Sequence, residues 1–89
     1  MTIRIAFDVG GVLSKFPDVF RPLLDSLGAI EPFGSGVEVW IISDVHPVEK
    51  IIETCRQNGL RFLDHRVRSA DYRIHGENCK AMLCRELGI

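Results

Sequence analysis

A carboxylate, a hydroxyl and an ammonium group occupy comparable places in three successive segments of the chain. Asp8 ends an apolar run and precedes two glycines, Ser43 ends a second apolar run, and Lys80 lies near the start of a helical pattern. The intervals between them are nearly equal, and each has about the length of one β-α unit. Together they offer what phosphoryl transfer requires, a nucleophile and donors that neutralise phosphate oxygens.

Each of these residues also has a purely structural interpretation. Asp8 could cap a turn that the glycines permit, and Ser43 could cap the helix that follows it. Lys80 could extend its long stem into solvent. A lysine in the first turn of a helix is nevertheless easier to explain when an anion is shared with the positive helix N-terminus. The alternatives stay open for each residue, and the regular spacing favours a shared site.

The hydrophobic pattern predicts strands and helices that alternate along the chain. The expected strands cover residues 2–8, 37–42 and 65–68, with a further short strand at 72–74. The expected helices run from about residues 19–22 to 27, over 47–58 and over 78–87. The expected helix caps are Gly28, Gly59 and Gly88, and a loop is expected over 31–36. Pro22 is expected in or near the first turn of its helix.

This alternation predicts an α/β domain of the three-layer, doubly wound, Rossmann-like type, with a parallel sheet between helices. Ligands of such sheets bind beyond the carboxyl ends of the strands. The residues that follow the first two strands, 8–13 and 43–46, are therefore the candidates for a site.

Composition limits the classes of protein to consider. The 89 residues suffice for one small domain over 1–89, and the apolar and charged shares, 46% and 26%, are typical of globular chains. A net charge of −1 gives no basic field for nucleic acid or anionic lipid, and no apolar run reaches the roughly 20 residues of a membrane span. Three cysteines without a CxxC pair favour reduced thiols and a cytoplasmic location.

Other conspicuous residues have structural interpretations. Cys55, Cys79 and Trp40 are expected in the core, and Cys84 lies off the apolar stripe. A local basic stretch is expected to be a solvated loop face, since no recognition-helix signature accompanies it. It comprises Arg61, His65, Arg66, Arg68, Arg73 and His75.

Three segments resemble motifs of the haloacid dehalogenase (HAD) superfamily. Residues 5–13, IAFDVGGVL, are similar to its first motif, and 39–43, VWIIS, to its second. Lys80, within CKAMLCRELGI, resembles the lysine of the third. The resemblance spans nearly the whole chain.

The resemblance implies that Asp8 attacks phosphorus and forms an aspartyl-phosphate. Ser43, Lys80, Gly10 and Gly11 would hold the phosphate, and Asp8 with the Gly10 carbonyl would bind Mg²⁺. The short intervals between motifs imply a capless domain that acts on a small phosphorylated molecule.

Two departures from the family pattern bear on catalysis. Gly10 stands where phosphatases of the family have a second aspartate, which acts as the general acid and base; Asp44 and His46 are the nearest substitutes. The acidic fourth motif would begin just past Ile89, so the sheet is expected to be incomplete and Mg²⁺ affinity poor. The chain is therefore expected to be a slow or inactive HAD-like hydrolase, or a non-catalytic module that binds a phosphorylated ligand or a protein.

Two further expectations follow. An incomplete sheet would leave a strand edge uncovered, which predicts a homo-oligomer formed through that edge. A signalling receiver domain also combines Asp, Ser and Lys, but it needs an acidic pair where this chain has only Asp8, so it is disfavoured.

Overall fold

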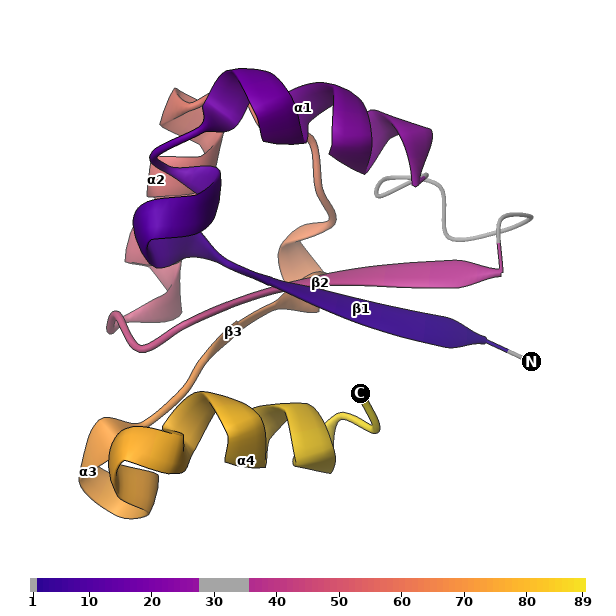
Figure 1. Cartoon of the computed structure of the whole chain (residues 1–89). Coiled ribbons are helices and arrows are strands. Elements are labelled where there is room, and N and C mark those ends of the chain that lie inside the picture. The colour runs from indigo at the N-terminus through magenta and orange to yellow at the C-terminus, as the bar shows by residue number, and fades with distance from the viewer. Residues whose placement is uncertain (1, 28–35) are drawn as a thin grey trace.

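The computed structural model describes residues 2–27 and 36–89 (Figure 1). The strands are β1 (Ile3–Asp8), β2 (Val37–Ser43) and β3 (Val67–Ser69). The main helices are α1 (Pro17–Ser26), α2 (Val48–Gln57), α3 (Tyr72–His75) and α4 (Cys79–Glu86). Short helical turns are η1 (Val9–Leu13), η2 (Asp64–Arg66) and η3 (Gly76–Asn78). The predicted alternation of strands and helices is confirmed.

The described strands form one parallel sheet in the order β1-β2-β3. In its register, Asp8 lies opposite Ile42, and Ser43 lies opposite Ser69. Figure 1 shows α1 and α2 on one side of the sheet and α4 on the other. The chain therefore has an α/β fold. The residues that end β1, β2 and β3 all lie at the same end of the sheet, where the carboxyl ends of its strands meet.

The main core lies between the sheet and the two helices α1 and α2. Side chains of β2 on this face, Val39 and Ile41, pack with buried residues of both helices. The other buried members are Val9, Leu13, Leu24, Ile51, Cys55, Leu60 and Val67. Trp40 and Ile42, on the opposite face of β2, are also buried. Burial on both faces explains the nearly continuous apolar run of this strand.

Three sequence predictions need correction. The further strand predicted at 72–74 is wrong, because Tyr72–His75 is helix α3. This helix begins where the Asp71 side chain accepts the Arg73 amide at 2.9 Å. The third strand begins later than expected, because Asp64–Arg66 forms a turn before Val67. Helix α1 begins at Pro17, so Pro22 lies in its middle and not in its first turn.

The predicted helix caps have mixed outcomes. Gly59 and Gly88 follow α2 and α4 with φ of 71° and 74°, the left-handed conformation of a C-terminal cap. Gly28 and most of the predicted loop over 31–36 lie outside the described residues.

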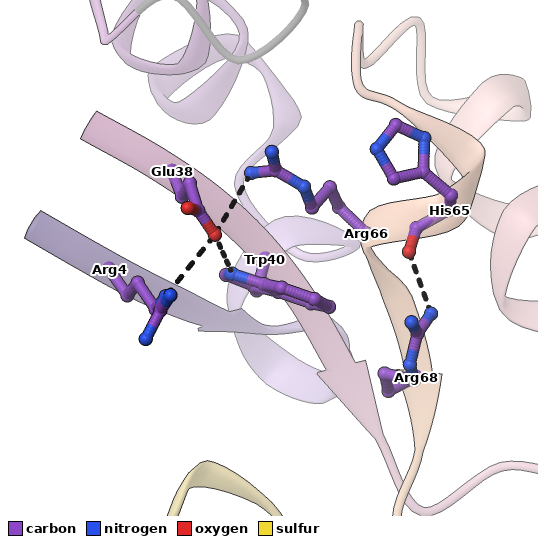
Figure 2. Close-up of polar contacts among 6 residues, drawn as sticks. All are labelled: Arg4, Glu38, Trp40, His65, Arg66 and Arg68. Carbon is purple, nitrogen blue, oxygen red and sulfur yellow. Dashed lines mark hydrogen bonds and ion pairs between the residues drawn. The ribbon is translucent and has the colours of Figure 1, made fainter. Parts of the chain in front are cut away.

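Two residues of the basic stretch, Arg66 and Arg68, pack against the sheet, whereas Arg61, His65 and Arg73 are exposed as predicted (Figure 2). The guanidinium groups of Arg66 and Arg68 lie 5.3 and 5.1 Å from the centre of the Trp40 ring. Glu38 accepts the Trp40 Nε1–H at 3.2 Å and pairs with Arg66 at 3.4 Å and with Arg4 at 3.3 Å. Burial raises the pKa of Glu38, but the Trp40 hydrogen bond and the Arg66 and Arg4 charges outweigh it and hold this pKa below its usual value.

Candidate functional site

Asp8 and Ser43 end neighbouring parallel strands, so the fold brings them to the same edge of the sheet. Asp8 is paired in register with Ile42, and Ser43 is the next residue of β2. Because successive side chains of a strand alternate between faces, Asp8 shares a face with Ile42 and not with Ser43. The sequence predicted the shared edge, but the register gives the two side chains different faces.

Lys80 reaches Asp8 from the opposite end of the chain. Its Nζ donates to Asp8 Oδ2 at 2.8 Å across 72 positions of sequence, and the two side chains are 36% and 33% exposed. The hydrogen bond to Asp8 raises the pKa of Lys80, burial opposes this, and the charges of Asp8 and Asp44 add to the increase. Asp44 is therefore within electrostatic reach of the same ammonium group.

The second oxygen of Asp8 is left without a hydrogen bond. Asp8 Oδ1 is buried and has no partner among the described residues. A buried carboxylate oxygen ordinarily has at least one donor or cation beside it, because desolvation without a partner is costly. The carboxylate therefore has capacity for one more donor or cation in addition to Lys80.

The turn after β1 leaves space beside Asp8. Gly11 has φ of 72°, which favours glycine, whereas Gly10 has φ of −66° and ψ of 119°, which any residue adopts. A Cβ atom at either position would meet no atom within 4 Å in the described chain. The backbone conformation at position 11 therefore favours glycine. At position 10, neither the backbone conformation nor the neighbouring atoms require glycine.

The Ser43 side chain has a structural partner. It is 2% exposed, and its Oγ accepts the Val45 amide at 3.2 Å. Its hydroxyl makes no hydrogen bond to Asp8 or Lys80 within the parts of the chain that the structure describes. The prediction that Ser43 caps the following helix is wrong, because the N-cap of α2 is Pro47 and has no side-chain hydrogen bond. Ser43 Oγ instead accepts within the turn after β2, and its O–H group is still a donor.

Ser69 and His46 hold the loops at this end of the sheet. Ser69 Oγ donates to the Val45 carbonyl at 2.8 Å, and His46 Nε2 lies 3.1 Å from the Ala70 carbonyl. These contacts join the segment after β2 to the end of β3. His46 is thereby engaged. Of the two suggested acids, exposed Asp44 is the one whose charge acts on Lys80. No spacing pattern in the sequence marks Ser69 for this role.

The oxygens available to a metal ion are few. Among residues 2–27 and 36–89, no group of three or more His, Cys, Asp and Glu side chains could hold a metal. Asp8 Oδ1 and the Gly10 carbonyl remain as protein oxygens at the site. Since Mg²⁺ usually keeps several waters and binds through one or two carboxylates plus substrate phosphates, these oxygens fit part of a coordination sphere and not a complete protein cage.

An open hollow lies elsewhere, on the outer side of α2 and η2. It is lined by Glu49, Ile52, Glu53, Arg56, Gln57 and Asp64. None of the predicted site residues lines it, and Arg56 and Asp64 pair with each other at 2.5 Å. The hollow therefore contributes nothing to the constellation around Asp8.

The described helices include none that combines the length and apolar character of a membrane span.

No protein-family model matches the chain, and no curated protein or solved structure shows significant similarity to it. Functional inference therefore depends on the site itself.

Proposed function

We propose that this chain is a HAD-like domain of the doubly wound type that binds the phosphate group of a small molecule beside Asp8 and Lys80. The observation that carries the proposal is the 2.8 Å contact between Lys80 Nζ and Asp8 Oδ2. Residues from opposite ends of the chain meet there at the carboxyl edge of a parallel sheet, where ligands of such folds bind. The partnerless Asp8 Oδ1 and the open space at Gly10 support the same location.

The proposed reaction is slow hydrolysis of a phosphate monoester through Asp8. A carboxylate oxygen attacks phosphorus, the ester P–O bond breaks, and the leaving oxygen departs with its electron pair. Water then hydrolyses the acyl phosphate, which releases phosphate and restores the carboxylate. Lys80 has three donors, so it can contact Asp8 and a phosphate oxygen together.

The surrounding groups have defined proposed roles. The Gly10 and Gly11 backbone and the Ser43 hydroxyl would contribute to the phosphate cradle. Mg²⁺, held by Asp8 and the Gly10 carbonyl, would neutralise phosphate charge when bound. Because no acid occupies position 10, the leaving group departs unprotonated, so aryl phosphates should react faster than alkyl phosphates.

The second candidate function is phosphate-ligand binding without turnover. It is favoured by the absence of a metal-binding cluster in the described chain and by Gly10. A cytoplasmic location is proposed from the free thiols of Cys55, Cys79 and Cys84. Self-association through a sheet edge is a separate proposal, developed below.

One experiment separates the two functions. Hydrolysis of p-nitrophenyl phosphate with Mg²⁺ is measured for the wild type, Asp8→Asn and Lys80→Met, alongside calorimetric binding of inorganic phosphate. We expect turnover that depends on Asp8 and is far below the typical enzyme value of about 10 s⁻¹. Phosphate binding that depends on Lys80, without hydrolysis, would establish the binding module instead. If the protein shows no hydrolysis and no Lys80-dependent phosphate binding, both proposed functions are refuted.

A further inference from the structure

Strand β1 forms one edge of the described sheet. It pairs with β2 along its whole length, and the order β1-β2-β3 leaves its other side without a described strand (Figure 1). Such an edge presents unpaired backbone N–H and C=O groups to any strand that can align with it. Proteins pair, cover or blunt such edges, so this side of β1 is a candidate surface for a second copy of the strand.

The side chains of β1 are complementary to those of a second copy of the same strand. Arg4, Ala6 and Asp8 share one face, because side chains alternate along a strand. If two β1 strands pair antiparallel about a two-fold axis at Ala6, Arg4 of each copy lies opposite Asp8 of the other. The same register sets Ile5 opposite Phe7 on the other face. Opposite charges and apolar pairs directly across strands both stabilise pairing.

Other registers that keep the same faces together lack this match. An axis at Arg4 or at Asp8 places like charges opposite each other, which is unfavourable. An axis at Ile5 or Phe7 leaves neither charge opposite its complement. The charges on β1 therefore select the register centred on Ala6.

Both charged groups are available for such a contact. The Arg4 side chain is 41% exposed and lies beside Gly88, and its contact with Glu38, at 3.3 Å, is an exposed ion pair of small energetic value. Glu38 would keep its contacts with Trp40 and Arg66 if Arg4 moved away. Asp8 is one-third exposed, and because its Oδ1 is buried, a second copy would make its contact at Oδ2, beside Lys80.

We propose that the chain forms a two-fold dimer in which the β1 strands pair antiparallel around Ala6. Each Asp8 then receives the guanidinium of Arg4 from the second copy, in addition to its own Lys80. Two three-stranded sheets become one continuous sheet. The proposal does not rest on phosphate chemistry, since Asp8 acts here only as a charged edge residue.

Cysteine cross-linking tests the register. In a Cys84→Ser background, Ala6→Cys places two thiols directly across the axis, whereas Ile3→Cys places them six residues apart along the strands, about 20 Å. We expect a short bifunctional maleimide to convert Ala6→Cys to covalent dimer and to leave Ile3→Cys unlinked. Cross-linking of Ile5→Cys in preference to Ala6→Cys would contradict the register.

Charge reversal tests the pairing itself. Light scattering of the wild type should give twice the chain mass. Arg4→Glu should raise the dimer dissociation constant about tenfold or more, since two attractive pairs become repulsive. Lys50→Glu, an equal charge change on exposed α2, should leave the dissociation constant unchanged. Arg4→Lys, which keeps the positive charge, should form the dimer as the wild type does. A wild type that stays monomeric at high concentration, or an Arg4→Glu variant that dimerises normally, overturns the proposal, and neither result bears on phosphate binding.

Discussion

The Lys80 ammonium holds the Asp8 carboxylate at 2.8 Å and so joins the first turn of α4 to the end of β1. In α4, Cys79 is the buried residue, and the apolar side chains that follow it are partly exposed. The ion pair therefore contributes to the placement of the helix as well as to the charge of the candidate site.

The first prediction concerns Lys80 and stability. Lys80→Met should lower the free energy of unfolding by about 0.5–1 kcal/mol in urea denaturation, a modest value because both partners are about one-third exposed. The pKa of Lys80 is raised in the folded state. The contribution of the charged lysine to the free energy of unfolding is therefore fully present below the ordinary lysine pKa and is lost as the pH rises through the higher folded value. The alkaline decline in stability should therefore be smaller in Lys80→Met than in the wild type.

Lys50 is the matched control for this comparison, because it is an exposed lysine on α2. Lys50→Met should leave both the stability at neutral pH and the alkaline decline close to those of the wild type. An equal loss in the two variants would mean that the Asp8–Lys80 contact adds no stability in solution.

The second prediction separates the two glycines of the turn after β1. Gly11→Ala should destabilise the fold by about 1 kcal/mol, because alanine is strained at φ of 72°. Gly10→Ala should be neutral or slightly stabilising, because its backbone is ordinary and its Cβ meets no atom. Thermal denaturation of both variants checks this, and equal losses would contradict the different backbone demands of the two positions.

The third prediction restores an acid beside Asp8. Gly10→Asp is accommodated by the same open space, and a carboxyl group there could protonate the leaving group. Under the proposed function, turnover of alkyl phosphates should rise by roughly 10²-fold or more. The gain should vanish in Gly10→Asp with Asp8→Asn, and Gly10→Asn is the isosteric control. Equal rates for Gly10→Asp and Gly10→Asn would exclude leaving-group protonation from position 10.

The fourth prediction distinguishes the two roles of Ser43. Ser43→Ala removes the acceptor of the Val45 amide and should cost about 1 kcal/mol of stability, while Ser43→Thr retains the hydroxyl. Inorganic phosphate affinity should fall less in Ser43→Ala than in Lys80→Met, because the Ser43 side chain is buried and lies on the other face of the sheet from Asp8. A larger effect of Ser43→Ala on phosphate affinity would make Ser43 the dominant phosphate ligand.

The fifth prediction concerns thiol reactivity. Burial raises the pKa of Cys55 to about 11, so at pH 8 only about one-thousandth of its thiol is ionised. Cys84 is partly exposed and should be alkylated first by iodoacetamide, followed much later by Cys55 as the chain unfolds. Peptide mapping of the native protein after timed labelling gives the order. Early modification of Cys55 would show that the α2 face of the core opens readily.

Much of the fold was predictable because hydrophobic spacing reflects burial directly. The apolar stripe of α2 and the continuous apolar run of β2 identify their elements, and both are found. The third strand was harder to place, because its three residues are set by pairing with Ile41, Ile42 and Ser43. The start of α1 was predicted too late, because its first turn begins at Pro17, before the apolar spacing that marks the helix in the sequence.

The candidate site was only partly predictable. Parallel strands imply that Asp8 and Ser43 share an edge, and that prediction needs only topology. The faces of their side chains depend on a one-residue register, which composition and spacing do not fix. The sequence predicts that Lys80 and Asp8 share a site, but their direct hydrogen bond depends on side-chain geometry that spacing does not fix.

The packing of Trp40 against Arg66 and Arg68 gives the chain an intrinsic optical reporter. It is the single indole in the sequence, it sits on the central strand, and both guanidinium groups come from the segment that forms β3. When β3 separates from β2, the ring loses its cover and meets water. Its fluorescence emission should shift to longer wavelength at that moment, so the opening of this edge can be timed without any attached dye.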